Sequence, residues 1–144
     1  MTTTVPACAL CDTDGGEVIA RNDRLRVVLV DDARYPGFCR VIWNAHAAEL
    51  TDLLPGDRSQ LMMAVCQVET VLRQVMAPHK INLAALGNLV PHLHWHVIPR
   101  FSDDAHFPAP VWADAQRVPV PSSLAARVAM LPALRLALQH AFRA

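Results

Sequence analysis

The chain has 144 residues, a length typical of one domain, and its thirteen lysine and arginine residues balance thirteen aspartate and glutamate residues. A general nucleic-acid-binding protein normally carries a basic excess, so the zero net charge argues against that class of partner. No apolar run approaches the ~18 residues of a membrane span, and the first residues lack the pattern of a signal peptide. We therefore expect a cytoplasmic protein with reduced thiols and no membrane association.

The first segments of the chain predict a meander of strands. Residues 1–7 are expected to form a loose tail, followed by Cys8 and Cys11 in a Cys-x-x-Cys spacing. This pair alone is compatible with zinc binding, with redox chemistry or with no special role. Three short β-rich runs follow at 17–20, 25–30 and 38–43, separated by residues that favour turns. Successive strands without intervening helices predict antiparallel pairing.

A long helix is predicted after Pro55-Gly56, because apolar residues recur there with helical spacing from Leu61 to Val75. Asp57 and Gln60 have the spacing of a capping box, and Pro78 ends the pattern. Cys66, inside this helix, is expected to be a packing thiol. Residues 81–86 predict a further strand, which Gly87-Asn88 would turn back into a hairpin with the next one.

Three histidines alternate with apolar residues between Val90 and Arg100. In an extended strand, His92, His94 and His96 project from one face, whereas Leu93, Trp95 and Val97 point toward a core. Prolines on both sides of the run oppose a helical interpretation. The residue pattern alone leaves open a metal centre, in which His106 is the one nearby extra ligand, a nucleophilic imidazole that attacks phosphorus, or a structural role.

The remainder of the chain has a different character. Residues 101–121 predict a proline-rich loop, and residues 122–144 predict a helical extension that Ser122-Ser123 caps and Pro132 kinks or restarts. Arg40 and Arg100 are expected to be solvated charges at strand ends, with phosphate binding as the alternative. Trp112 and Phe107 are expected to pack in the core or at an interface, with stacking on a base as the alternative.

The segment from His92 to Ile98 fits the pattern His-φ-His-φ-His-φ-φ, where φ is apolar, and resembles the histidine-triad (HIT) family. The resemblance extends over about residues 8–112, and it includes Asp31-Asp32 before a Tyr-Pro-Gly turn, Leu86-Gly87-Asn88, and His106-Phe107-Pro108. It implies one α+β domain over residues 1–144, in which an antiparallel five-stranded sheet carries one long helix and a C-terminal helical segment. It also implies a homodimer.

The resemblance further implies hydrolysis or transfer of a nucleotidyl group at the α-phosphate of dinucleoside polyphosphates or nucleoside phosphoramidates. His94 would be the nucleophile that forms a covalent intermediate, oriented by the backbone carbonyl of His92, and His96 would contact a phosphate oxygen. Asp31 or its neighbour Asp32 would meet the ribose hydroxyls. Asn82 and Asn88 match positions that place polar side chains near the phosphates or the leaving group.

One segment departs from the family pattern, because Trp43-Asn44-Ala45-His46 lacks the basic residues that many members have there but keeps the histidine. In some branches of the family a structural zinc is held by two cysteines, this histidine and the first triad histidine. Here those positions are Cys8, Cys11, His46 and His92, a Cys₂His₂ set. The alternatives are a slow or inactive nucleotide-binding protein that keeps the site, and a metal-dependent enzyme that uses the histidine row itself.

Overall fold

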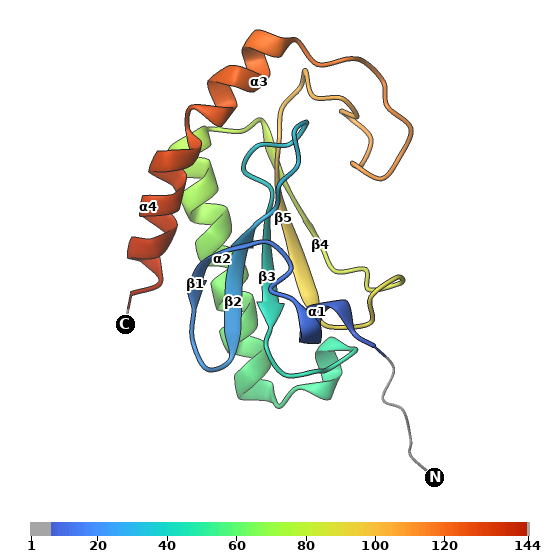
Figure 1. Cartoon of the computed structure of the whole chain (residues 1–144), viewed down its shortest axis with the longest axis vertical. Helices are drawn as coiled ribbons and strands as arrows, with labels where there is room; N and C mark the ends of the chain where they lie inside the picture. The colour runs from blue at the N-terminus through green and yellow to red at the C-terminus, as the bar shows by residue number, and fades with distance from the viewer. Residues whose placement is uncertain (1–6, 144) are drawn as a thin grey trace.

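The computed structural model describes residues 7–143, which form one antiparallel sheet with helices on its faces (Figure 1). The sheet has five strands in the order β1-β2-β3-β5-β4. Their bounds are β1 Glu17–Arg21, β2 Leu25–Leu29, β3 Cys39–Trp43, β4 Lys80–Ala84 and β5 His94–Arg100. The α+β fold class and the five-stranded antiparallel sheet predicted from the sequence are therefore confirmed.

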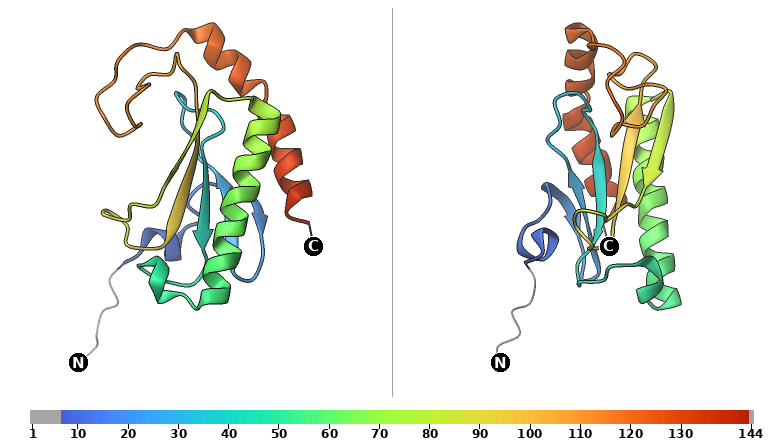
Figure 2. Two further views of the ribbon diagram at one scale, coloured as in Figure 1. Left: turned by 180° about the vertical axis from the view of Figure 1, so that it is seen from behind. Right: turned by 90° about the vertical axis from the view of Figure 1, so that its right-hand side faces the viewer.

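The long helix α2 (Pro55–Met76) covers one face of the sheet, and α4 (Leu131–Ala141) lies beside it on the same face. The short α3 (Pro121–Val128) precedes α4, a 3-10 turn (Leu50–Asp52) precedes α2, and α1 (Ala9–Asp12) lies on the opposite side of the sheet, as Figure 2 shows. No helix within residues 7–143 is both long enough and apolar enough to cross a membrane.

The two sheet faces have different roles. Val27, Val41 and Val97 are fully buried against α2 and α4 in the main core. Residues of opposite parity project from the other face, where Ile42 packs with Leu10 of α1. His94 and His96 share this second face, because His94 is paired with Ile42 across β3 and β5. The period of two therefore places the imidazoles away from the helices.

Three local predictions are wrong, two of them at the starts of helices, and one is confirmed. Helix α2 begins at Pro55 after Leu54, with no side-chain cap, because proline suits the first turn of a helix, where no N–H partner is needed; the capping box at Asp57 is not formed. Helix α3 likewise begins at Pro121, so the Ser122-Ser123 cap is absent. Cys66 is exposed rather than packed. The restart of the helix around Pro132 is confirmed.

Candidate active site and metal centre

His94 and His96 lie side by side on β5, with ring centroids 4.9 Å apart and ring planes at 81°. Nδ1 of His94 donates to the backbone carbonyl of His92 at 2.6 Å. This bond assigns the ring proton to Nδ1 and leaves a lone pair on Nε2. Burial lowers the pKa of His94, and the charge of Arg40 adds to this against the opposing effect of the His92 carbonyl. His94 is therefore a neutral imidazole with a fixed tautomer at neutral pH.

The side chain of His96 is 6% exposed and lies between aromatic rings of Phe38 and Trp112. Burial, together with the charges of His94 and Arg40, lowers the pKa of His96 to about 4. Its Nδ1 is one of three buried side-chain nitrogens in residues 7–143 that have no hydrogen-bond partner. A buried polar atom without a partner is costly, so His96 is prepared to bind a group supplied by a ligand.

Arg40 lies directly opposite His96 in the pairing of β3 with β5. Its Nη1 donates to the carbonyl of Gly15 at 3.0 Å, whereas its buried Nε has no partner among residues 7–143. No carboxylate of the described residues forms an ion pair with this guanidinium. The expectation of a solvated charge is therefore wrong, and Arg40 gives this face an uncompensated positive charge suited to an anion.

A cavity of about 470 Å³ opens beside His94. Its lining combines Ala9 and Leu10 of α1 and the segment Thr13-Asp14-Gly15-Gly16 with Arg40, Val90 and His94. The volume lies in the range of small-molecule sites, which are mainly apolar with a few placed polar groups. The cavity therefore has the size to receive a small molecule next to His94, with Arg40 as an unpaired positive group and with Asp14 already paired with Arg21.

The other predicted nucleotide-binding residues are more dispersed. Asp31 is exposed and lines a separate cavity of about 560 Å³ with residues of α3 and α4, including Val128 and Arg135. Asn88 is exposed in the loop between β4 and β5. The side chain of Asn82 projects from the same face as the triad but accepts a hydrogen bond from Arg100 at 2.7 Å. None of these side chains is hydrogen-bonded to His94 or His96 in the described part of the chain.

The four predicted metal ligands converge. Cys8, Cys11, His46 and His92 each bring a ligand atom to within 4.8 Å of the others. Nδ1 of His92 is 3.4 Å from both sulfurs, and Nδ1 of His46 is 3.5 Å from Cys11 Sγ. Zinc bonds of about 2.3 Å to sulfur and 2.0–2.1 Å to nitrogen place S and N roughly 3.5 Å apart in a tetrahedron. The donor set and its spacing therefore fit a closed zinc site.

His92 connects this cluster to His94. Its Nε2 donates to the carbonyl of Trp43 at 2.6 Å, which directs Nδ1 toward the thiols, as in metal sites where a second partner orients a ligating imidazole. Its own carbonyl accepts the His94 bond. β5 begins only at His94, so the three histidines are not one equivalent row: two belong to the sheet and His92 belongs to the cluster.

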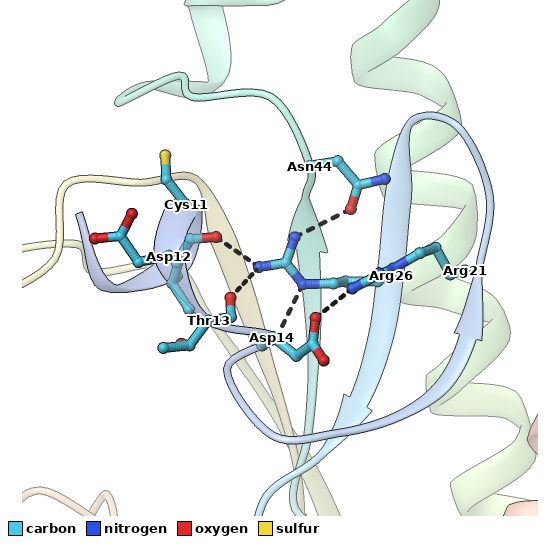
Figure 3. Close-up of a pocket in the computed structure, with 8 residues that line it drawn as sticks. Cys11, Asp12, Thr13, Asp14, Arg21, Arg26 and Asn44 are labelled. Atoms are coloured by element: carbon cyan, nitrogen blue, oxygen red, sulfur yellow. Dashed lines mark hydrogen bonds and ion pairs between the residues drawn. The ribbon is translucent and has the colours of Figure 1, made fainter. Parts of the chain in front are cut away.

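Arg26 holds the segment that carries the two cysteines (Figure 3). This residue is 4% exposed, and it donates to the carbonyls of Leu10 at 2.7 Å, Thr13 at 3.2 Å and Asp14 at 2.9 Å and to Asn44 at 3.1 Å. A guanidinium suits this task because its donors lie in one rigid plane. Arg26 thereby ties α1 to β2, a role for which the sequence carried no signal.

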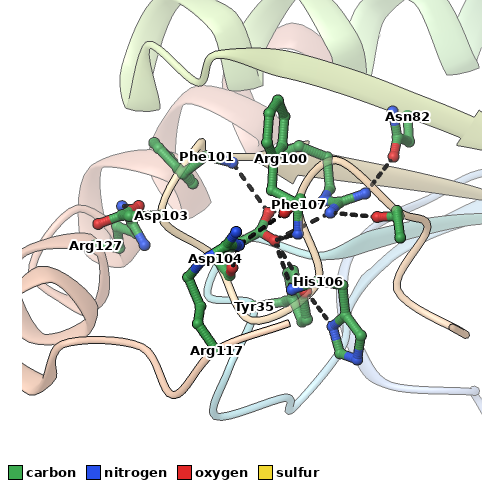
Figure 4. Close-up of polar contacts among 11 residues, drawn as sticks. Tyr35, Asn82, Arg100, Phe101, Asp103, Asp104, His106, Phe107, Arg117 and Arg127 are labelled. Carbon is green, nitrogen blue, oxygen red and sulfur yellow. Dashed lines mark hydrogen bonds and ion pairs between the residues drawn. The ribbon is translucent and has the colours of Figure 1, made fainter. Parts of the chain in front are cut away.

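A second buried network was missed from the sequence (Figure 4). Arg100 and Asp104, 2% and 1% exposed, form a two-pronged ion pair at 2.7 and 3.0 Å. Burial alone would raise the pKa of Asp104, but Arg100 and backbone N–H donors outweigh it and lower this pKa to about 2. The Tyr35 hydroxyl lies 3.3 Å from Asp104 and 2.5 Å from Nδ1 of His106. His106 is therefore part of this network and not of the metal cluster.

Replacing Asp104 with asparagine should lower the free energy of unfolding by about 3 kcal/mol, because it leaves the buried Arg100 charge without its counter-ion. Urea unfolding measures the loss. Arg135→Gln is the matched control, since it breaks the exposed pair with Glu17, for which a change below about 1 kcal/mol is expected. Equal effects of the two substitutions would contradict a structural role of the buried pair.

Stability toward acid should depend on His96. Its pKa is about 4 in the folded chain and about 6.5 in an unfolded one. Between these values the unfolded chain binds a proton that the folded chain does not, so the contribution of His96 is complete above pH ~6.5 and is lost as the pH falls toward ~4. When the pH is lowered from ~7 to ~4.5, the free energy of unfolding measured with urea should fall by up to about 3 kcal/mol more in the wild type than in His96→Asn. Equal losses would contradict the lowered pKa.

Comparisons with known proteins agree with this geometry. A family model described as the HIT domain matches residues 14–103. The AP-4-A phosphorylase of Mycobacterium tuberculosis is 34% identical over 98 residues, which cover 64% of this chain and 50% of that protein. The asymmetrical bis(5'-nucleosyl)-tetraphosphatase of Schizosaccharomyces pombe is 32% identical over 74 residues, which cover 48% of this chain and 41% of that protein. The chain thus spans half the length or less of these relatives.

Among solved structures, a histidine triad protein from Bradyrhizobium japonicum superimposes with a TM-score of 0.72 at 30% identity, covering 90% of this chain and 92% of that one. The likeness therefore extends over most of the fold. Because the HIT domain model matches more than half of the residues, including all three histidines of the triad, the chain belongs to the HIT family.

Proposed function

We propose that this protein hydrolyses or transfers a nucleotidyl group by attack of His94 on the α-phosphate of a dinucleoside polyphosphate or a nucleoside phosphoramidate. The observation that carries the proposal is the bond from His94 Nδ1 to the His92 carbonyl, which leaves the Nε2 lone pair available beside a cavity. A neutral imidazole of this kind is a competent nucleophile. The two curated relatives, whose names refer to tetraphosphate cleavage or phosphorolysis, support the substrate class.

Two covalent steps account for the reaction. In the first, Nε2 of His94 forms a bond to the α-phosphorus, and the bond to the leaving group breaks with its electron pair going to the leaving group, which departs as a phosphate anion or, from a phosphoramidate, as an amine that takes up one proton from solvent. In the second, water attacks the same phosphorus, the P–N bond breaks, and the water loses one proton to solvent; inorganic phosphate would replace water in a phosphorolysis. Phosphoryl transfer of this type depends mainly on positioning and charge stabilisation.

Neighbouring residues supply that stabilisation. Neutral His96 would donate one N–H to a non-bridging phosphate oxygen, and Arg40 would balance the negative charge from across the strand pair. The cavity beside His94 would hold the transferred nucleoside. The roles predicted for Asp31 with the ribose, and for Asn82 and Asn88 with the phosphates, remain predictions for the bound state.

We also propose that Cys8, Cys11, His46 and His92 bind a structural zinc ion. The support is their convergence and their mutual spacing, which suit a tetrahedral Cys₂His₂ site with no open position. When bound, the ion would stabilise the fold rather than activate water. Burial lowers the pKa of His92, and this favours the neutral imidazole that a metal ligand requires.

The experiment is a substrate panel followed by trapping of the intermediate. Diadenosine polyphosphates of three lengths, adenosine 5'-phosphoramidate and ATP are incubated with the protein, in buffer alone and with inorganic phosphate. Turnover of the first two classes and a labelled nucleotidyl adduct on His94 are expected. Activity retained after chelation would separate this mechanism from a metal-dependent enzyme. Absence of both turnover and adduct across the panel would sink the proposal and favour a nucleotide-binding protein.

A further inference from the structure

Trp112 is a large apolar side chain that the structure leaves in solvent. It is 52% exposed, and its ring lies 5.1 Å from that of His96 at an angle of 67°. This exposure contradicts packing in the core, whereas the expected alternative of packing at an interface is not tested; the residue lies in the loop after β5. An indole that is half exposed and neighbours the ring of His96 is placed to contact a ligand bound at the proposed phosphate site.

The loop around Trp112 is tied down on both sides. Arg100 donates to the carbonyl of Ala109 at 2.7 Å, and the N–H of Ala113 donates to Pro110 at 3.0 Å. Arg117 donates to the carbonyls of Asp104 at 2.6 Å and Phe107 at 2.8 Å (Figure 4). The buried Arg100–Asp104 pair thus fixes the loop from beneath. Ordering the indole in this position therefore requires no further rearrangement when a ligand arrives.

The cavity and Trp112 adjoin different histidines of the proposed site. His94 lines the cavity with Arg40 and the α1 turn, whereas neither His96 nor Trp112 does. The ring of His96 neighbours both other rings, with its centroid 4.9 Å from that of His94 and 5.1 Å from that of Trp112. A phosphorus atom held at His94 and His96 would therefore have one substituent in the cavity and another that leaves toward Trp112.

We propose that Trp112 is a stacking platform for the base of the leaving nucleotide, so that the preferred substrates are dinucleoside polyphosphates rather than phosphoramidates. This rests on the proposed function, which it makes more specific. Indole faces stack on any base with little regard to sequence, and such contacts contribute through desolvated apolar area. A leaving group without a nucleobase, such as the amine of a phosphoramidate, has no aromatic ring to stack on the indole of Trp112. Trp112 also lies outside residues 14–103, which the family model matches.

The test compares leaving groups with one transferred group. The values of kcat/KM for diadenosine tetraphosphate and adenosine 5'-phosphoramidate are measured for the wild type, Trp112→Ala and Trp112→Phe. Trp112→Ala should lower the value for the dinucleotide about five- to a hundredfold more than for the phosphoramidate, as expected from the loss of one stacked base. Trp112→Phe should restore most of this selectivity. Leu136→Ala, which removes a 68% exposed side chain on α4, is the matched control and should leave the ratio unchanged.

Equal losses for both substrates, or no loss for either, would overturn the platform while leaving the proposed function intact. The platform would also be overturned if Trp112→Ala changed the sedimentation coefficient, because the indole would then belong to an interface between copies. If the wild type turned over neither substrate, the proposed function would fail. The platform would then be judged from binding alone: Trp112→Ala should weaken the binding of diadenosine tetraphosphate at least fivefold more than the binding of AMP. Equal weakening of the two affinities would overturn the platform.

Discussion

His94→Ala is expected to lower kcat roughly 10⁴-fold or more, because it removes the proposed nucleophile of the two-step reaction and leaves only substrate binding and charge stabilisation. The fold should survive, since the ring is half-buried and its one hydrogen bond is to the His92 carbonyl. Single-turnover kinetics with a labelled dinucleoside polyphosphate measure the rate and the adduct together. The adduct should be absent from this variant.

The control for this result is His140→Ala, which removes an exposed histidine of α4 far from the triad in sequence. Its kcat should equal that of the wild type. His96→Ala is expected to lower kcat about 10²- to 10³-fold, the usual effect of removing one hydrogen-bond donor to a developing oxyanion. If His94→Ala retained adduct formation, another residue would be the nucleophile. If it retained turnover without an adduct, direct attack by water would replace the covalent mechanism.

Removal of zinc is expected to have the largest effect on stability. The wild type purified without chelator should contain about one zinc ion per chain. Chelation should lower the free energy of unfolding by about 4 kcal/mol or more, which is the stabilisation expected from a ligand whose concentration is far above its dissociation constant. Cys11→Ser should lose the ion and reproduce this loss. Metal analysis and thermal unfolding of the same samples provide the measurement.

The matched control is Cys66→Ser, because Cys66 is an exposed thiol of α2 that lies outside the cluster. It should keep its metal and its unfolding temperature. A wild type without metal would refute the zinc site. His92→Gln and His94→Ala should also differ: the first should lose metal and stability, while the second should lose the adduct but keep both.

The parts of this site that could be predicted are those in which neighbouring residues in the chain are also neighbours in space. The alternation around His94 and His96 follows from the period of two of a strand, so their common face and the opposite burial of Val97 were predictable. The role of His92 was partly predictable, because the resemblance pointed to Cys8, Cys11 and His46, and the structure places their ligand atoms together.

Other features depend on contacts that no local pattern encodes. Asp104 is four residues from Arg100, but the buried network that the two form also includes Tyr35, which is 69 residues from Asp104 in the chain. Whether an arginine such as Arg100 is solvated or buried depends on what covers it, and here the loop after β5 does so. The expectation for Cys66 was wrong for the same reason, since local helical signals do not report which neighbours the helix meets.

The sequence by itself determined the antiparallel sheet and the long helix, because strand and helix periods are local properties of the chain, and its histidine motif carried the resemblance to the family, which in turn implied the four residues that converge as a metal cluster. Only the tertiary structure decided that Arg40 carries an uncompensated charge opposite His96, that Arg26 holds the cysteine-bearing turn, and that Trp112 is exposed beside the triad. The physical reason is that burial and the pairing of charges depend on which segments meet after folding.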